Sequence, residues 1–263
     1  MALRLTSLTL YPIKSASGIA TRTWHLDDFG LRHDRRWMVV DPAGRLVTQR
    51  THPRLALVRP TVLQTSLLVE APGVAPLELP LAPSGSVVLK ATIWDDVCDA
   101  LWLGHGPAQW ISTVLRSPCA LVYMPESTVR PADPAYAPPG ARVSFADGFP
   151  FLLISEESLA DLNRRLAEPL PMNRFRPNLV IAGGEPYSED ALDRFEIDGV
   201  AFRVVKPCGR CVVTTTDQET TKRGVEPLRT LATYRKQDGE VMFGQNVVHL
   251  GIGRLTVGAP LLV

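Results

Sequence analysis

Short runs in which apolar and polar residues alternate dominate the first half of the chain, and they predict β-strands separated by turns. Alternation at every second position is typical of a strand with one buried face. Extended segments are expected at residues 3–13, 21–27, 34–41, 45–49, 55–63, 67–70, 87–94 and 119–124. The segment 45–49 is the expected hairpin partner of 34–41. One helix is expected at residues 104–116, where Trp110, Val114 and Leu115 have helical spacing.

The second half continues the strand pattern and adds two helices. Ser155 precedes Glu156 and Glu157 and then apolar residues at helical spacing, which predicts a helix with Ser155 as its N-cap. A short helix is expected at residues 227–234. Strands are expected at residues 175–181, 200–205, 212–216, 241–250 and 254–257, and residues 260–263 close the chain. The whole pattern predicts a mainly β protein with a few helices.

A proline-rich segment separates the two halves. Residues 125–139 contain five prolines and few large apolar side chains, which predicts a surface loop or connector. The 263 residues are enough for one large domain or two small ones. We therefore expect two parts, residues 1–124 and residues 125–263, with the connector at about residues 125–148.

Composition excludes several classes of partner. The formal net charge of +1 is not that of a nucleic-acid-binding chain. No run of about 18 apolar residues is present, so no membrane span is expected, and the N-terminus lacks the pattern of a signal peptide. Four cysteines without a disulfide-dense pattern suit a reducing compartment, so we expect a cytoplasmic protein.

The candidate chemistry centres on a pair of cysteines, Cys208 and Cys211, with Lys206 and Arg210 beside them. The β-branched run that follows predicts a strand, which would place both thiols in the turn that enters it. Positive charge lowers a thiol pKa and favours the thiolate. A single thiolate that acts as ligand or nucleophile is therefore the favoured interpretation.

Three other interpretations of the cysteine pair stay open. A redox pair usually opens a helix, whereas a strand is expected here. A zinc site needs four ligands, and Cys98 and Cys119 are isolated in the sequence. The two thiols could also simply be buried.

Six short segments, in order along the chain, resemble the MOSC proteins, which are related to the C-terminal domain of molybdenum cofactor sulfurases. The resemblance is strongest to members in which a MOSC N-terminal β-barrel domain precedes the MOSC domain, such as the mitochondrial amidoxime-reducing components and their bacterial homologues. The matching segments are Tyr11-Pro12-Ile13-Lys14-Ser15, Asp34-Arg35-Arg36-Trp37, Ile154-Ser155-Glu156-Glu157-Ser158-Leu159, Arg174-Phe175-Arg176-Pro177-Asn178, Cys208-Gly209-Arg210-Cys211 with Thr214-Thr215, and Phe243-Gly244-Gln245-Asn246.

The resemblance implies a molybdenum cofactor, Mo-molybdopterin, with Cys211 as the metal ligand and catalytic residue and Cys208 not a ligand. The cofactor-binding positions are Lys14, Ser15, Arg35, Ser155, Arg176 and Asn178, and Arg210 adds a further guanidinium. A phosphate and a dithiolene suit such cationic groups and hydrogen-bond donors, and the N-terminus of the helix after Ser155 favours an anion. Simpler roles are also open, because Lys14 and Arg35 could be surface charges and Ser155 a plain N-cap.

The resemblance implies an oxidoreductase that reduces small N-hydroxylated substrates such as amidoximes or hydroxylamines. The alternative is a molybdenum-cofactor carrier or sulfur-handling protein without turnover. No lysine has a recognisable Schiff-base context, so pyridoxal phosphate is not expected, and no cysteine follows Cys211, so no iron–sulfur cluster is expected. Electrons would come from a separate protein, such as a ferredoxin-like protein or a flavin reductase.

Overall fold

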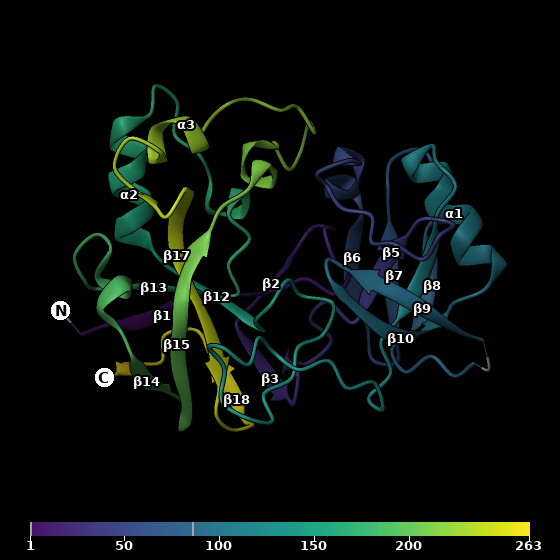
Figure 1. The fold of residues 1–263 in the computed structure, drawn as a ribbon, viewed down its shortest axis with the longest axis horizontal. Coiled ribbons are helices and arrows are strands. Elements are labelled where there is room, and N and C mark those ends of the chain that lie inside the picture. Colours follow the sequence, from purple (N-terminus) through teal and green to yellow (C-terminus); the bar gives the residue numbers. More distant parts are fainter. Residues whose placement is uncertain (1, 86) are drawn as a thin grey trace.

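The computed structural model describes residues 2–85 and 87–263, and it has two lobes side by side (Figure 1). The lobe that holds both chain ends carries α2 and α3, and the other lobe carries α1. Strands dominate both lobes, which confirms the predicted mainly β fold. The division at residue 124 stays a prediction.

The larger lobe is organised on a nine-stranded sheet in the order β19-β14-β15-β17-β12-β13-β1-β2, with β16 paired to β17. These strands are β1 (Arg4–Leu10), β2 (Ile19–Thr21), β12 (Phe151–Ser155), β13 (Leu179–Ala182), β14 (Arg194–Ile197), β15 (Val200–Gly209), β16 (Lys236–Gln237), β17 (Glu240–His249) and β19 (Leu261–Leu262). All pairs are antiparallel except β12 with β13. Strand β1 lies beside β13, which confirms that the first residues return to the second part.

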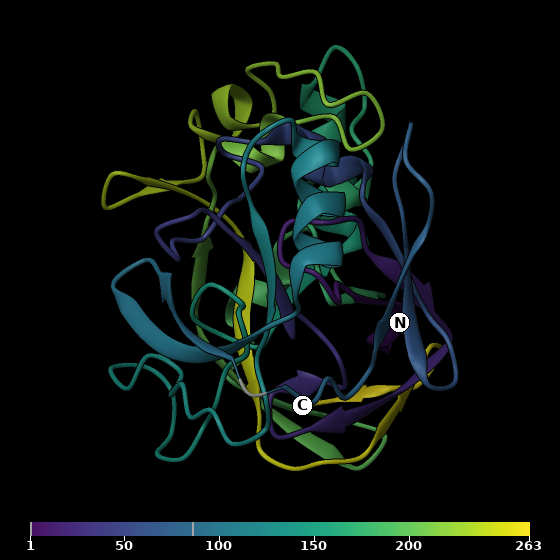
Figure 2. The same ribbon diagram turned by 90° about the vertical axis from the view of Figure 1, so that its right-hand side faces the viewer.

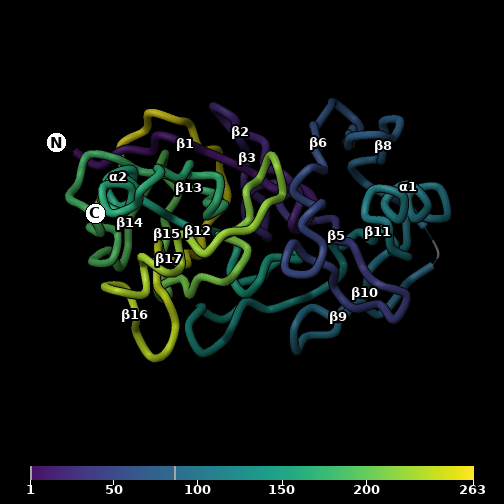
Figure 3. Tube along the Cα trace, turned by 90° about the horizontal axis from the view of Figure 1, so that it is seen from above, coloured from purple at the N-terminus to yellow at the C-terminus, as the bar shows by residue number. Residues whose placement is uncertain are grey.

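The other lobe contains two smaller sheets. One has the order β5 (Trp37–Val40), β11 (Ala120–Tyr123), β10 (Asp96–Trp102) and β9 (Val88–Ile93), and the other has β6 (Arg59–Val62), β7 (Ser66–Glu70) and β8 (Leu77–Pro80). Helix α1 (His105–Leu115) buries Ile111, Val114 and Leu115 in this core. A third sheet of β18 (Arg254–Thr256), β3 (Thr23–Asp27) and β4 (Gly30–Leu31) connects the chain end to the N-terminal segment. Figure 3 shows that segment passing from β1, beside β13, to β5 in the second lobe.

The run after the cysteine pair is not the predicted strand. Cys208 itself lies in β15, and Val212–Thr215 forms the 3₁₀-helix η4. The hydroxyls of Thr214 and Thr215 donate to the carbonyls of Cys211 and Val212, at 2.9 and 2.8 Å. These local side-chain bonds satisfy a helical turn and override the β propensity of the residues. The argument that a strand follows the cysteines was therefore wrong.

Two smaller predictions also differ from the structure. The hairpin partner expected at residues 45–49 forms no named strand: Leu46 makes an isolated antiparallel bridge to Val40, and Arg45 makes a parallel bridge to Thr92. The start of the strand expected at residues 55–63 belongs instead to η1 (Pro53–Leu57), and β6 begins after it. A proline begins η1, and a tight turn precedes residue 45. Both favour local backbone hydrogen bonds that the alternation of apolar and polar residues does not predict.

The remaining helices follow local signals. Helix α2 (Glu156–Arg165) begins after Ser155, whose hydroxyl accepts from the Ser158 N–H at 3.1 Å. Short helices η2 (Met172–Arg174), η3 (Ser188–Ala191) and α3 (Leu228–Leu231) lie close to α2 or η4. Within the sheet, Gly244 on β17 has a φ of 79° and approaches the Leu153 carbonyl of β12 so closely that no room is left for a side chain.

The proline-rich connector has neither helix nor named strand in its described residues, as predicted, and it forms irregular loops at one edge of the molecule in Figure 2. It is nevertheless held by a buried side chain. The Arg130 guanidinium donates to the carbonyls of Ser144, Ala146 and Asp147 at 2.8, 2.6 and 2.8 Å. Its Nε donates to Asp96 on β10 at 2.8 Å. The end of the connector is therefore fixed where it meets the cleft between the lobes.

Candidate functional site

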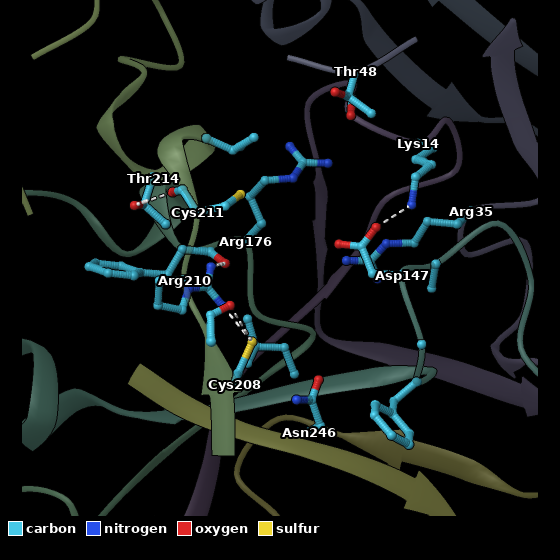
Figure 4. A pocket seen from close by; sticks show the side chains of 18 of the residues that line it. Lys14, Arg35, Thr48, Asp147, Arg176, Cys208, Arg210, Cys211, Thr214 and Asn246 are labelled. Atoms are coloured by element: carbon cyan, nitrogen blue, oxygen red, sulfur yellow. Dashed lines mark hydrogen bonds and ion pairs between the residues drawn. The ribbon is translucent and has the colours of Figure 1, made fainter. Parts of the chain in front are cut away.

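A cleft between the lobes collects most of the residues predicted for the site (Figure 4). Seven of the eight predicted residues line it: Lys14, Ser15, Arg35, Arg176, Asn178, Arg210 and Cys211. They come from four separate parts of the chain: the loop after β1, the turn before β5, the segment before β13, and the end of β15. In Figure 4, Cys208, Cys211, Arg176 and Arg210 lie on one side of the cavity, and Lys14, Arg35 and Asp147 lie on the other.

Ser155 is the predicted residue that the structure does not bring into the cleft. Its side chain is fully buried, and its hydroxyl caps α2. The Glu189 carboxylate accepts from the Ser155 N–H at 3.1 Å and from the Ser158 hydroxyl at 2.9 Å. The helix N-terminus thus already holds an anion from the protein itself, so the predicted cofactor contact of Ser155 is not supported.

The cysteine pair occupies the end of β15 and the start of η4. Both thiols are free, and both line the cleft. The Arg210 guanidinium donates to the Cys208 sulfur at 3.0 Å and to the Phe175 carbonyl at 2.6 Å. Among residues 2–85 and 87–263 no hydrogen bond engages the Cys211 sulfur. The Cys208 sulfur is therefore hydrogen-bonded within the cysteine turn, whereas the Cys211 thiol makes no hydrogen bond there.

Two guanidinium groups lie against one buried tyrosine ring. The Arg176 and Arg35 groups are 4.3 and 4.5 Å from the centre of the Tyr11 ring. The Tyr11 hydroxyl donates to the Pro177 carbonyl at 3.1 Å, and burial raises its pKa to about 12. Burial also lowers the pKa of Arg176 to about 10. In the described chain no carboxylate pairs with Arg176. Its guanidinium is therefore a desolvated cation that lacks an anionic partner.

Asn178 and Asp34 hold Arg35 in place. The Asn178 side-chain oxygen accepts from Arg35 at 2.8 Å, and its amide donates to the Thr9 carbonyl and to Asp34 at 3.1 and 3.2 Å. Asp34 is buried, pairs with Arg35, and accepts from the Tyr11 N–H at 2.6 Å. Burial raises the pKa of Asp34 despite these partners. The polar groups of Asn178 are thus already engaged, and its role is to position Arg35.

Lys14 and Asp147 form a further polar wall of the cleft, and the sequence analysis did not identify Asp147. The Lys14 ammonium donates to Asp147 at 2.7 Å and to the Phe145 carbonyl at 2.6 Å. Desolvation lowers the Lys14 pKa, and the pairing with Lys14 holds the pKa of Asp147 well below its usual range. Within the part of the chain that the structure describes, hydrogen bonds reach only one Asp147 oxygen, and the Asp147 side chain is 73% exposed.

Other missed residues line the same cleft, among them Thr48, Arg50, Trp94 and Asn246. The segments of Thr48, Arg50 and Trp94 gave no chemical signal because they are ordinary turns, whereas Asn246 lies within β17 in one of the six matching segments but was not assigned a role there. Asp147 stands before Gly148 at the end of the connector, and an Asp-Gly pair after such a loop is the one signal that could have pointed to it.

The cleft as a whole is an anion site. Cationic groups lie on both sides of it, from Lys14, Arg35, Arg50, Arg176 and Arg210, against one carboxylate among the described lining residues, that of Asp147. Arg210 Nε is buried and has no partner in the described residues. A buried donor without an acceptor is costly unless a ligand supplies one.

In the described residues no cluster of three or more His, Cys, Asp or Glu could hold a metal alone, and no helix is long and apolar enough to cross a membrane.

Comparisons with known proteins extend over both lobes. Residues 2–118 match the MOSC N-terminal beta barrel domain family, and residues 140–261 match the MOSC domain family. The chain is 36% identical to mitochondrial amidoxime-reducing component 1 of Homo sapiens, over 96% of this chain and 80% of that protein. It is 34% identical to mitochondrial amidoxime reducing component 2 of Rattus norvegicus, over 95% and 80%. It is also 34% identical to the molybdenum cofactor sulfurase of Solanum lycopersicum, over 91% of this chain but 32% of that protein.

Proposed function

Because the chain belongs to the MOSC family, with a MOSC N-terminal beta barrel domain followed by a MOSC domain, we propose that its cleft binds a molybdenum cofactor. We propose further that the loaded protein reduces N-hydroxylated compounds such as amidoximes and hydroxylamines. The observation that carries the proposal is the free Cys211 thiol in a cleft whose other polar groups suit an anion.

The residues present fit such a cofactor. A pterin phosphate needs donors and positive charge, and Arg176 and the buried Arg210 Nε lack acceptors in the described chain. The Ser15 hydroxyl lines the cleft and makes no hydrogen bond within the described residues. A thiolate is a suitable ligand for a soft metal, and Cys211 is the unengaged thiol.

Each residue has a distinct part in the proposal. Cys211 holds the metal, which in the bound cofactor supplies two-electron redox chemistry. Arg176 and Arg210 neutralise the anionic groups, and Arg35, fixed by Asn178, approaches from the other lobe. Lys14 and Asp147 form a polar wall of the cleft, where the ionised Asp147 accepts hydrogen bonds through its free oxygen.

Electrons come from a separate protein in this proposal. The sequence contains no G-x-G-x-x-G nucleotide fingerprint, no C-x-x-C-H haem attachment and no cysteine after Cys211. A ferredoxin-like protein or a flavin reductase would suit, through a small and transient contact.

The alternative function is a cofactor carrier or sulfur-handling protein, and one observation favours it. Cys208 is a second free thiol in the same cleft, and relatives named molybdenum cofactor sulfurase match both parts of the chain. A carrier would bind the cofactor without turnover.

One assay distinguishes the reductase from the cofactor carrier. Protein made in a cofactor-competent host is analysed for molybdenum and pterin and then given benzamidoxime. We expect no turnover with NADH alone and turnover with a chemical reductant or an added redox partner. Bound cofactor without any turnover would favour the carrier, and the absence of molybdenum would refute both.

A further inference from the structure

Trp94 has an unfavourable backbone conformation beside the cleft. It follows β9, and Ile93 pairs with Asp96 across a two-residue turn to β10. The φ of Trp94 is 53°, in the left-handed region that glycine normally occupies at the first position of such a turn. A bulky side chain in this conformation is strained, and such strain clusters at functional sites.

Three segments hold the indole at the cleft. Its Nε1 donates to Asp147 on the connector at 3.0 Å, and the Lys14 ammonium, from the loop after β1, lies 5.9 Å from the ring centre. The Arg50 guanidinium, from the loop after β5, lies 4.2 Å from the ring centre. The indole is still 38% exposed, and both Trp94 and Arg50 line the cleft. These contacts are with residues that themselves line the cleft. The indole is therefore placed to contact a ligand bound in the cleft.

Arg50 is a cation without a counter-charge. Its side chain is exposed and makes no ion pair or hydrogen bond within residues 2–85 and 87–263, whereas Arg45, in the same loop, pairs with Asp41 at 3.0 Å. The cations that suit the cofactor lie around Tyr11 and at the cysteine turn. Arg50 and Trp94 lie instead with Lys14 and Asp147, at the polar wall of the cleft.

We infer that Trp94 and Arg50 form a specificity-determining subsite for substrates that combine a flat ring with an anionic group. The exposed part of the indole packs against the ring, and the free guanidinium pairs with the anion. This inference rests on the proposed function, since it selects among N-hydroxylated substrates. A flat ring with an anionic group could also belong to an extended form of the cofactor rather than to the substrate. The test therefore has one arm for each of these two sources.

The test uses two ligands that cannot be reduced because they lack the N-hydroxyl group: benzamide and 4-carbamoylbenzoate. Their dissociation constants are measured by calorimetry on molybdenum-loaded and unloaded protein. We expect tighter binding of 4-carbamoylbenzoate, and we expect Arg50→Ala to reduce this preference by about three- to tenfold, as for a partly exposed charged pair. Arg50→Lys should retain part of the preference, and Arg45→Ala should leave it unchanged.

A second variant separates recognition from stability. Trp94→Gly relieves the strained φ, so the melting temperature should not fall, yet both ligands should bind more weakly because the flat surface is gone. A fall in stability with unchanged binding would show that Trp94 is merely structural and would overturn the inference.

The remaining outcomes are equally decisive. An unchanged preference in Arg50→Ala would remove Arg50 from the subsite. Loss of molybdenum or pterin in Arg50→Ala would assign the residue to the cofactor and also overturn the inference. If the wild-type protein takes up no molybdenum, the proposed function fails, whereas the unloaded protein still tests the subsite through the difference between wild type and Arg50→Ala.

Discussion

Arg176→Ala should change the stability of the unloaded protein and its affinity for the cofactor in opposite directions. Burial lowers the Arg176 pKa from 12.5 to about 10. At about 1.36 kcal/mol per pKa unit, keeping this group charged costs the unloaded fold roughly 3 kcal/mol. The contact with Tyr11 returns about 0.5–1 kcal/mol. Removing the guanidinium should therefore stabilise the unloaded protein by on the order of 2 kcal/mol, or a rise of several degrees in Tm.

The pH at which this is measured matters. Because the unfolded chain binds this proton first, the folded form loses stability as pH falls from 12.5 to about 10, and the full cost is present below about pH 10. Thermal unfolding at pH 7 therefore contains the whole effect. In the loaded protein the same change removes a charge-assisted contact with an anion, which contributes about 1.5–3 kcal/mol, so cofactor affinity should fall by at least about tenfold.

The assays are thermal unfolding of the unloaded protein and the molybdenum and pterin content of the loaded protein. Arg176→Lys should restore occupancy only in part, because lysine lacks the planar fork. Arg194→Ala, at an exposed position on β14, is the matched control and should change neither quantity. Full occupancy in Arg176→Ala would remove the residue from the site. A lower Tm of the unloaded variant would refute the desolvation argument.

Further predictions concern the thiols, the helix cap and pH. Cys211→Ser should abolish molybdenum retention by metal analysis, whereas Cys208→Ser should cost less, and equal losses would indicate a two-thiol site. Ser155→Ala should lower the free energy of unfolding by about 1 kcal/mol through the lost cap while cofactor content stays unchanged, and a loss of cofactor would return Ser155 to the site. Burial lowers the pKa of His33 from 6.5 to about 4, so stability should fall as pH drops from 6.5 to 4, since the unfolded chain binds the proton first. His33→Gln should flatten that slope in pH-dependent unfolding, and an unchanged slope would contradict the assignment.

Local sequence was sufficient wherever an element depends on its own residues. Strands β1, β13 and β17 follow from apolar alternation or from apolar runs, and the N-cap of α2 follows from Ser155 and the glutamates after it. The short segments around Lys14, Arg35, Arg176 and Cys211 indicated the shared cleft only through their resemblance to the MOSC proteins, because each segment fixes its own residues but not the position of the other segments.

Tertiary structure decided what depends on partners distant in sequence. Ser155 and Glu189 are 34 positions apart, and only the fold shows that this carboxylate, rather than a ligand, occupies the start of α2. Asp147 acquires its lowered pKa from Lys14, which is 133 positions away. Trp94 reaches the cleft because a hairpin, a loop and the connector converge there. Periodicity reports which face of an element is buried, but charge, burial and hydrogen bonding at a site are sums over neighbours that only the folded chain brings together.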